Sequence, residues 1–416
     1  MPHNSKTIWI IRDLEPLPTD PGDRRLMRAG MLAHAFARLG HSTRWITSSF
    51  DHYQKRQREP RRQELSLAPD LAITVLPGRG YRRNISLARI AHNRAFARDV
   101  LLFAERSGER PDVIVTDIPT TEAAAAVVAF GRAHAIPTVV SIRDLWPDFF
   151  TEPFPPLLRP LIGLALSPLE QQARSACANA TALMGISETY LSWGLDKAGR
   201  VRRSEDGVYP LGYAPRNLEA TEIDAGVAAL GVRLDKPIVA FVGSWGKTYD
   251  LDLLLTGLRI LGRSDIQFVI AGTGENHARL APQMQALPNV SVPGWISANQ
   301  IAALLSRSSI GLLPYSKAAP QGLPNKIFEY MAYGAFQIST LPGEAASLLS
   351  ELNAGRTVPA GDPTALAAAI EEATVDPATT AGRDERRQHF MQRFHADAIY
   401  DAMANHILLV AEKGYR

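Results

Sequence analysis

The chain has 416 residues, a length that allows two or three domains with large hydrophobic cores. Its content of 46% hydrophobic and 21% charged residues is ordinary for a soluble globular protein. The single cysteine, Cys177, excludes an intramolecular disulfide and argues against a cysteine zinc site, so we expect a small core residue. No apolar run reaches the roughly 18–20 residues of a membrane-spanning helix, and we expect a cytoplasmic protein.

The formal net charge is +3, and the basic excess lies in the first half of the chain. Two basic clusters stand out there: Lys55, Arg56, Arg58, Arg61 and Arg62, and then Arg79, Arg82 and Arg83. They lack interleaved aromatic residues and belong to no DNA-binding motif, so we expect no nucleic-acid partner. Two interpretations stay open, a solvated loop or a surface for an anionic membrane or a phosphate-bearing acceptor.

The first half of the chain predicts alternating strands and helices. We expect strands at Thr7–Arg12, Thr43–Ser48, Asp112–Asp117, Thr138–Arg143 and Ala182–Ile186. Helices are expected at Arg24–Leu39, which repeats apolar residues at helical spacing, and at the alanine-rich Thr121–Ala135. A strand, a loop, a helix and a second strand form the opening of a Rossmann-type unit.

The pattern returns in the second half, after Pro210, Gly212 and Pro215 interrupt it. Strands are expected at Pro237–Val242, Gln267–Ala271, Val290–Pro293, Ile310–Leu313 and Phe336–Ser339, with a helix at Asp250–Leu261. The sequence thus predicts an α/β protein with two doubly wound domains, residues 1–212 and 213–395. A last helix within 396–416 is expected to complete the first domain.

The most informative stretch is Gln321–Gly334, in which a glycine turn and a proline lead into a helix. Free backbone N–H groups at Gly322 and Leu323 would form an anion site at the start of that helix. Glu329 follows one turn later, where its carboxylate can accept both hydroxyls of a ribose. The alternative is structural, because Lys326 and Glu329 have the spacing of a helical ion pair.

This stretch resembles the second half of the Glu-x7-Glu motif of GT-B glycosyltransferases of family 4. Neighbouring pieces agree in order and spacing: Phe241–Gly243, Leu253–Leu255, Ile270–Glu275, Pro293–Trp295 and Leu312–Ser316. The first half resembles a narrower subgroup, the bacterial amino-sugar transferases of O-antigen and capsule assembly. That match consists of Gly40-His41, Trp45–Phe50 with His52 and Lys55, and Arg143–Pro147.

The resemblance implies two Rossmann-like domains facing a central cleft and a retaining transfer without metal or cofactor. It implies a nucleotide-sugar donor, with UDP favoured, and a lipid-linked or surface-polysaccharide acceptor. Residues that look like donor ligands are Gly243, Gly272, Gly274, Glu275, Gly294, Trp295, Gly322, Leu323 and Glu329. Residues that look like parts of the catalytic and acceptor side are Lys247, Gln321, Arg143, Asp144, and the loop residues Gly22, Asp23 and Arg24.

The sequence also departs from the family pattern. Gln321 replaces the first glutamate of the motif, and the usual arginine after Gly243 is missing, which leaves Lys247 as the nearest cation. Two alternatives therefore stay open, a sugar-nucleotide epimerase and a catalytically inactive nucleotide-sugar-binding subunit. Asp250-Leu251-Asp252 matches the pattern of an Asp-x-Asp metal motif, but we interpret it as the acidic start of a helix. The basic first half and the apolar, proline-broken stretch Pro153–Leu169 predict peripheral contact with the inner face of the plasma membrane. The alternative for this stretch is an ordinary interdomain helix with a proline-rich lead-in.

Overall fold

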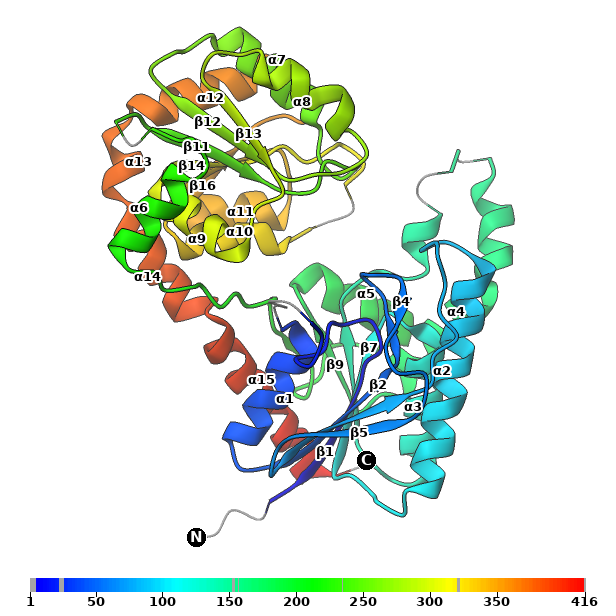
Figure 1. The fold of residues 1–416 in the computed structure, drawn as a ribbon. Coiled ribbons are helices and arrows are strands. Elements are labelled where there is room, and N and C mark those ends of the chain that lie inside the picture. The colour runs from blue at the N-terminus through cyan, green and yellow to red at the C-terminus, as the bar shows by residue number, and fades with distance from the viewer. Residues whose placement is uncertain are drawn as a thin grey trace. The chain divides into compact units, whose positions relative to one another are not determined.

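The structure is a computed structural model, and it describes residues 5–21, 26–151, 154–155, 157–233, 235–319 and 322–414. The chain divides into two compact units (Figure 1). Unit 1 consists of Met1–Leu211 and Ala396–Arg416, and unit 2 is Gly212–His395. Among the described residues, no helix is long and apolar enough to cross a membrane.

Unit 1 is built on an eight-stranded sheet in the order β10-β9-β8-β7-β1-β2-β6-β5. Its strands are β1 (Thr7–Ile11), β2 (Ser42–Ser48), β5 (Gln63–Ala68), β6 (Leu71–Leu76), β7 (Val113–Ile118), β8 (Thr138–Ile142), β9 (Ala182–Gly185) and β10 (Gly207–Val208). All neighbours pair in parallel except β5 and β6, which are antiparallel. A small separate pair joins β3 (Phe50–Asp51) and β4 (Arg56–Gln57).

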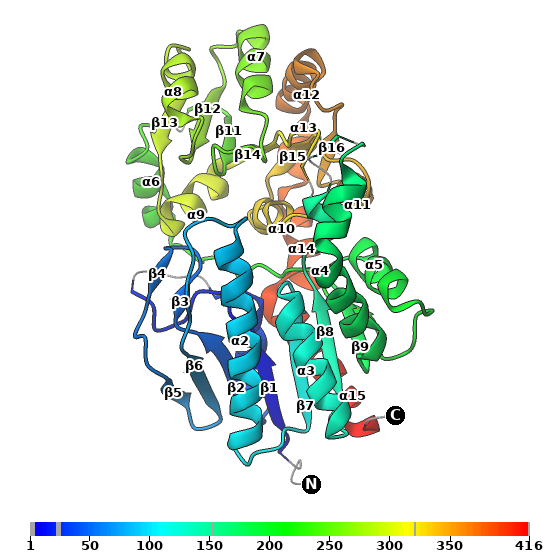
Figure 2. The same ribbon diagram turned by 90° about the vertical axis from the view of Figure 1, so that its right-hand side faces the viewer.

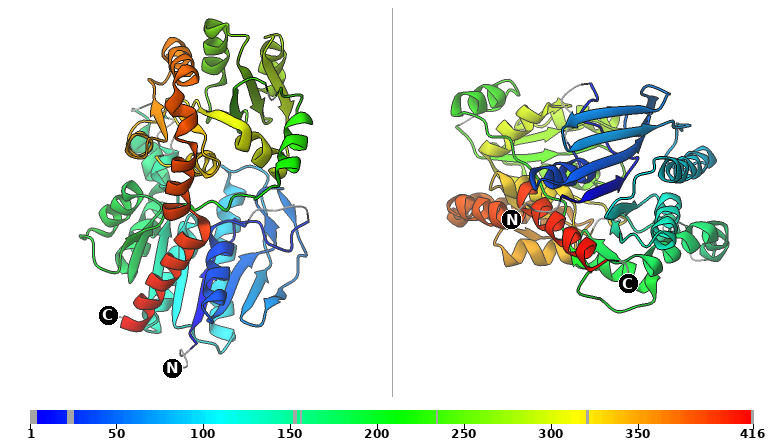
Figure 3. Two further views of the ribbon diagram at one scale, coloured as in Figure 1. Left: turned by 90° about the vertical axis from the view of Figure 1, so that its left-hand side faces the viewer. Right: turned by 90° about the horizontal axis from the view of Figure 1, so that it is seen from below.

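Successive residues of β1 face opposite sides of the sheet, as the pleat requires. Ile8 and Ile10 pack beneath α1 (Arg28–Arg38) and α15 (Ala396–Lys413), which lie side by side (Figure 3). Trp9 and Ile11 pack on the other face, beneath α2 (Leu87–Arg106) and α3 (Thr121–Ala133). A third cluster joins α3, α4 (Arg159–Asn179) and α5 (Glu188–Ala198), and buries Cys177 as expected. A short 3-10 helix, Asp148–Phe150, precedes α4.

Unit 2 is built on a six-stranded parallel sheet in the order β13-β12-β11-β14-β15-β16. The strands are β11 (Ile238–Val242), β12 (Gln267–Ala271), β13 (Val290–Gly294), β14 (Ser308–Leu313), β15 (Phe336–Ser339) and β16 (Gly355–Thr357). The helices are α6 (Ala220–Ala228), α7 (Leu251–Leu261), α8 (His277–Gln285), α9 (Ala298–Arg307), α10 (Asn325–Ala332), α11 (Glu344–Glu351), α12 (Pro363–Val375), α13 (Pro377–Ala381) and α14 (Arg383–Arg393). Helix α7 packs on α8 and α12, α6 packs on α9, and α10 packs on α14.

The predicted fold class, two doubly wound Rossmann-like domains, is confirmed, and every strand expected from the sequence is present. Two helix starts were predicted wrongly. Helix α1 begins at Arg28 instead of Arg24, because Leu26 and Met27 are not helical and the buried Glu15 carboxylate caps the Ala29 N–H at 2.9 Å. Helix α10 begins at Asn325 instead of Leu323, because Pro324 takes an extended conformation and serves as its N-cap.

Candidate functional site

The start of α10 presents unsatisfied backbone donors. The Ile327 N–H bonds to the Pro324 carbonyl at 3.2 Å, whereas no described residue accepts from the N–H groups of Asn325 and Lys326. Free N–H groups at a helix N-terminus attract anions. Gly322 and Leu323, predicted as the amide donors, stand in the turn before the helix. The helix itself, with its first N–H groups, therefore begins at Asn325.

Glu329 lies one turn into α10 and is only 8% exposed. The ammonium group of Lys326 donates to its Oε2, so the predicted helical pair is formed. Burial raises the pKa of Tyr249 to about 12, and the negative charge of Glu329 adds to that rise. The pKa values of Tyr315 and Tyr330 are raised by burial and, more weakly, by the same carboxylate. These three phenols therefore stay protonated at neutral pH, and the Glu329 carboxylate lies close enough to raise the pKa of each.

These tyrosines join α10 to the ends of the central strands. The Tyr330 hydroxyl accepts from the Val242 N–H at 2.8 Å, at the end of β11. Tyr249 and Tyr315, whose hydroxyl oxygens are 3.2 Å apart, follow β11 and β14. Because the carboxyl ends of parallel strands meet at one edge of a sheet, Glu329 lies near the carboxyl edge of the unit 2 sheet, the edge at which doubly wound folds bind ligands.

A glycine-based contact joins the turns after β11 and β12. The Gly243 N–H bonds to Ala271 and the Trp245 N–H to Thr273, at 3.1 and 2.9 Å. A Cβ on Gly272 would lie 1.8 Å from the Gly243 carbonyl oxygen, and one on Gly274 would lie 2.7 Å from the Trp245 backbone. Both positions also have positive φ, so only glycine fits. The Trp245 side chain of this turn is buried, and its ring packs on that of His277 with centroids 4.8 Å apart.

The same set of contacts extends to β13. The Gly272 N–H donates to the Gly294 carbonyl at 2.7 Å, and Trp295 follows with 74% of its surface exposed. An exposed tryptophan at this edge offers an aromatic face for a flat ring. Glu275, the other predicted neighbour of the base, is exposed. The structure thus brings Gly243, Gly272, Gly274 and Gly294 together.

The start of α7, which follows β11, holds two acids in structural roles. Asp250 caps α7 by accepting from the Leu253 N–H at 2.9 Å, and Asp252 pairs with Arg279 at 2.6 Å. Among the described residues, no three His, Cys, Asp or Glu side chains gather where a metal ion could be held. Lys247, the predicted cation of this loop, is exposed, and its side chain has no partner among the described residues.

Unit 1 has a buried charge network at the carboxyl ends of β1, β7 and β8. Arg143 contacts Glu15 and lies 3.2 Å from Asp117, and Arg12 lies 3.6 and 3.4 Å from the same two carboxylates. Burial alone would lower the pKa of Arg143, but Glu15 and Asp117 raise it above its usual value. The sequence did not single out Arg12, Glu15 or Asp117. The only signal was their place at or near the carboxyl ends of the expected strands.

Asp144 is less constrained than Arg143. Its carboxylate has no hydrogen-bond partner among the described residues and lies at the surface near Arg143, Arg12 and Arg89. Partial loss of water raises the pKa of Asp144, and the three arginines oppose that rise. Trp146 is buried and lies 4.4 Å beneath the Arg89 guanidinium, so it packs as part of the core.

Some sequence features do not join these sites. Burial lowers the pKa of His52 to about 4, so it is neutral at pH 7, and its ring contacts Tyr81. His41 precedes β2 and contacts the Lys6 N–H at the amino edge of the sheet. Gly22, Asp23, Arg24 and Gln321 lie outside the described residues.

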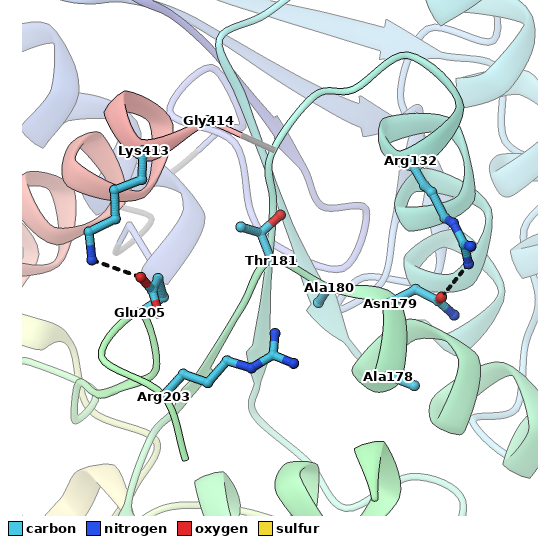
Figure 4. A pocket seen from close by; sticks show the side chains of 9 residues that line it. All are labelled: Arg132, Ala178, Asn179, Ala180, Thr181, Arg203, Glu205, Lys413 and Gly414. Atoms are coloured by element: carbon cyan, nitrogen blue, oxygen red, sulfur yellow. Dashed lines mark hydrogen bonds and ion pairs between the residues drawn. The ribbon is translucent and has the colours of Figure 1, made fainter. Parts of the chain in front are cut away.

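Unit 1 also has a cavity of about 830 Å³ beside the amino end of β9 (Figure 4). Thr181 lies at its centre, and two polar contacts flank it, Arg132 to Asn179 and Lys413 to Glu205, each at 2.7 Å. The cavity lies at the sheet edge opposite Arg143. It therefore stands apart from the charge network described above.

Comparison with known families agrees with this geometry. Residues 27–202 match the glycosyl transferase 4-like domain, and residues 236–376 match the glycosyl transferases group 1 domain. The fold and these two matches define a GT-B glycosyltransferase. Its two halves belong to these two domain families, and together the matches cover most of the chain. A search of curated proteins gave no match.

Solved structures share the fold over nearly the whole chain at low identity. Sucrose-phosphate synthase from Thermosynechococcus elongatus has a TM-score of 0.69 at 17% identity, covering 96% of this chain and 98% of that one. HepE from Anabaena in complex with UDP gives 0.66 at 16%, with the same coverage. Starch synthase IV from Arabidopsis thaliana, bound to ADP and acarbose, gives 0.64 at 12%, covering 98% and 99%.

Proposed function

We propose that this glycosyltransferase moves a sugar from a UDP-sugar, with retention at the anomeric carbon, to a lipid-linked or surface-polysaccharide acceptor. The observation that carries the donor part is the buried Glu329 carboxylate, one turn inside a helix whose first N–H groups find no acceptor in the described part of the chain. A carboxylate accepts both ribose hydroxyls, and the helix end receives the diphosphate. Trp295 and the turn at Gly272–Glu275 flank the base.

The chemistry follows from charge. The bond between the anomeric carbon and the diphosphate oxygen breaks, and its electron pair leaves with the diphosphate. The acceptor hydroxyl oxygen forms the new bond, and its proton passes to the departing phosphate. Fixed N–H groups and a cation stabilise the charge that develops on the leaving group. Gln321 lies near the transferred sugar in this proposal, with Lys247 on the diphosphate.

Unit 1 supplies the acceptor side of the proposal. Arg143 is held by two carboxylates, so it offers a fixed guanidinium to the sugar or the acceptor. Asp144 offers a free carboxylate beside it for a hydroxyl group. The loop residues Gly22, Asp23 and Arg24 would complete this side.

The donor base is proposed from the solved relatives. HepE was crystallised with UDP, with UDP and glucose, and with UDP-glucose, whereas starch synthase IV held ADP. A thermal-shift screen with UDP, GDP, dTDP and ADP tests this point, because a ligand that binds the native state raises its melting temperature. We expect the largest shift with UDP. A larger shift with another diphosphate would replace UDP in the proposal.

Two features support a lipid-linked acceptor at the membrane: the resemblance of the first half to bacterial amino-sugar transferases, and the exposed apolar residues of α4. We propose an amino-sugar transfer in O-antigen or capsule assembly, at the inner face of the plasma membrane. Transfer to a lipid-linked acceptor in anionic vesicles is the test. Transfer only to a free soluble sugar would contradict the proposal of a lipid-linked acceptor.

Gln321 and the missing arginine after Gly243 favour one second candidate, an inactive nucleotide-sugar-binding subunit. Incubation with donor and acceptor separates the two. Formation of glycosylated product supports the transferase. Tight donor binding with neither transfer nor donor hydrolysis supports the binding subunit.

A further inference from the structure

Lys326 occupies a position in α10 that ordinarily disfavours a cation. It is the second residue of the helix, where the partial positive charge of the helix dipole is greatest. Its own N–H and that of Asn325 have no acceptor among the described residues, and no acidic residue lies in the first turn. A lysine there adds positive charge to a site that already has an excess of it.

Glu329 supplies a negative charge that offsets the positive charge of Lys326. Lys326 donates to its Oε2, and only 23% of the Lys326 side chain and 10% of the Glu329 side chain are exposed. The pair is therefore largely shielded from water, which strengthens the attraction between its members. Lys326 is held in one place before any ligand arrives.

The other lysines at this sheet edge are not held. Lys247 and Lys317 are exposed, and within the described ranges neither side chain has a hydrogen-bond or ion-pair partner. A diphosphate that leaves with additional negative charge is stabilised best by groups that are fixed beforehand. Lys326 meets that condition, and the two loop lysines do not.

We propose, on the basis of the proposed function, that Lys326 is the principal cation of the donor diphosphate and exchanges its partner when nucleotide binds. In the free protein it neutralises Glu329. In the complex, Glu329 accepts the ribose hydroxyls, and Lys326 joins the N–H groups of Asn325 and Lys326 on the phosphate oxygens. The one ion pair thus prepares both the ribose site and the diphosphate site.

The proposal separates the two members of the pair by the ligand that each recognises. Lys326 should matter for a nucleoside diphosphate and not for the nucleoside, whereas Glu329 should matter for both. Calorimetric titration of Lys326→Ala, Lys326→Arg and Glu329→Gln with UDP and with uridine measures this difference. Lys236→Ala is a matched control, because Lys236 precedes β11 at the opposite edge and, among the described residues, hydrogen-bonds only to the Ser264 carbonyl.

We expect Lys326→Ala to lose at least tenfold in UDP affinity and nothing in uridine affinity. Lys326→Arg should recover part of the loss, and Lys236→Ala should match the wild type. Thermal unfolding of each unliganded variant shows whether it folds. Equal changes for UDP and uridine in Lys326→Ala, or no change in either, would overturn the proposal and leave Lys326 as a structural partner of Glu329.

Transfer measured on the same proteins keeps the two proposals apart. A wild-type protein that binds UDP without transferring sugar contradicts the proposed transferase, and the UDP and uridine comparison still decides the role of Lys326. If another nucleoside diphosphate raises the melting temperature more than UDP does, the binding comparison uses that diphosphate and its nucleoside in place of UDP and uridine.

Discussion

At the scale of single residues, the most specific prediction concerns Glu329 and the ribose. If its carboxylate accepts two ribose hydroxyls, Glu329→Ala should weaken nucleotide binding by about 3 kcal/mol, since each bond to a charged group contributes about 1.5–3 kcal/mol. That loss is roughly a hundredfold in the dissociation constant for UDP. Calorimetry measures it, and the matching 2′-deoxynucleotide should bind the wild type more weakly. Unchanged affinity in the alanine variant would remove Glu329 from the ribose site.

Gln321 carries the second residue-scale prediction. An amide has nearly the shape of a carboxylate, offers donors as well as acceptors, and removes one negative charge beside the diphosphate. We therefore expect Gln321→Glu to lower donor affinity without raising the turnover number, and Gln321→Ala to slow transfer more than it weakens nucleotide binding. Steady-state kinetics and direct binding measure the two effects. An inert parent that gains activity through Gln321→Glu would instead establish the inactive-subunit interpretation.

At the scale of elements, local sequence predicted what local forces decide. The strands follow from short apolar runs, and the glycine turns at Gly243 and Gly272 follow from positions that exclude side chains. The first residues of α1 and α10 do not follow from local sequence. A carboxylate 14 residues away caps α1, and an extended proline shifts the start of α10 to the next residue. Helix α2 was missed because it buries polar residues such as His92 and Asn93.

The candidate site shows the same division. Glu329 and Lys326 lie within one helical turn, so their pairing was readable from spacing. The network of Glu15, Asp117 and Arg143 was not readable from the sequence. Asp117 and Arg143 lie more than 100 residues from Glu15 in the chain, and the strand order brings the three together. Only parallel strands that end at one edge create that contact.

The turn between α5 and β10 carries a prediction at this scale. Asp206 is buried and accepts from Arg200 and from the N–H groups of Leu183 and Arg203, at 2.6–2.8 Å. Burial raises the pKa of Asp206, but these donors together lower it below its usual value. Asp206→Asn should reduce the free energy of unfolding by about 3 kcal/mol, because it leaves the guanidinium poorly paired. Urea unfolding at pH 7 measures this loss.

The pH dependence of that loss has a fixed sign. A carboxylate whose pKa is lowered by folding contributes stability above its unfolded pKa of about 3.9. That contribution disappears as the pH falls through the folded pKa. The difference between wild type and Asp206→Asn should thus be full near neutrality and should shrink below about pH 4. A difference that stayed constant into acid would mean that the Asp206 charge is not the stabilising feature.

At the scale of the whole molecule, one exposed surface of unit 1 calls for a partner. Leu157, Leu161 and Leu164 are 91%, 66% and 73% exposed, and no described residue of α4 before Leu169 is buried. Figure 2 shows this part of α4 extending beyond α3. Pro153 and Pro156 of the predicted apolar stretch lie outside the described residues. Contiguous exposed apolar residues mark an interaction surface.

The start of α2 adds to this surface. Ile85 and Leu87 are exposed there beside the exposed Arg82 and Arg83. Arg89, on the same turn, stacks on Trp146 at 4.4 Å, which connects α2 to the chain leading into α4. Arg82 and Arg83 have no side-chain partner among the residues that the structure describes. Apolar side chains next to such arginines fit a bilayer with anionic headgroups, because the apolar side chains insert and the arginines attract the headgroups.

The last prediction is therefore that the protein sediments with vesicles containing phosphatidylglycerol and less with neutral vesicles. Burying a leucine contributes about 1.5–3 kcal/mol, so Leu161→Ser with Leu164→Ser should weaken vesicle binding at least tenfold. Leu102→Ser with Leu409→Ser, two exposed leucines on α2 and α15, is the matched control and should bind like the wild type. High salt should reduce binding, because it screens the arginines. Equal recovery of the wild type in the supernatant with and without anionic vesicles, at low and at high salt, would remove the membrane from the proposed function, and the apolar end of α4 would then need a protein partner.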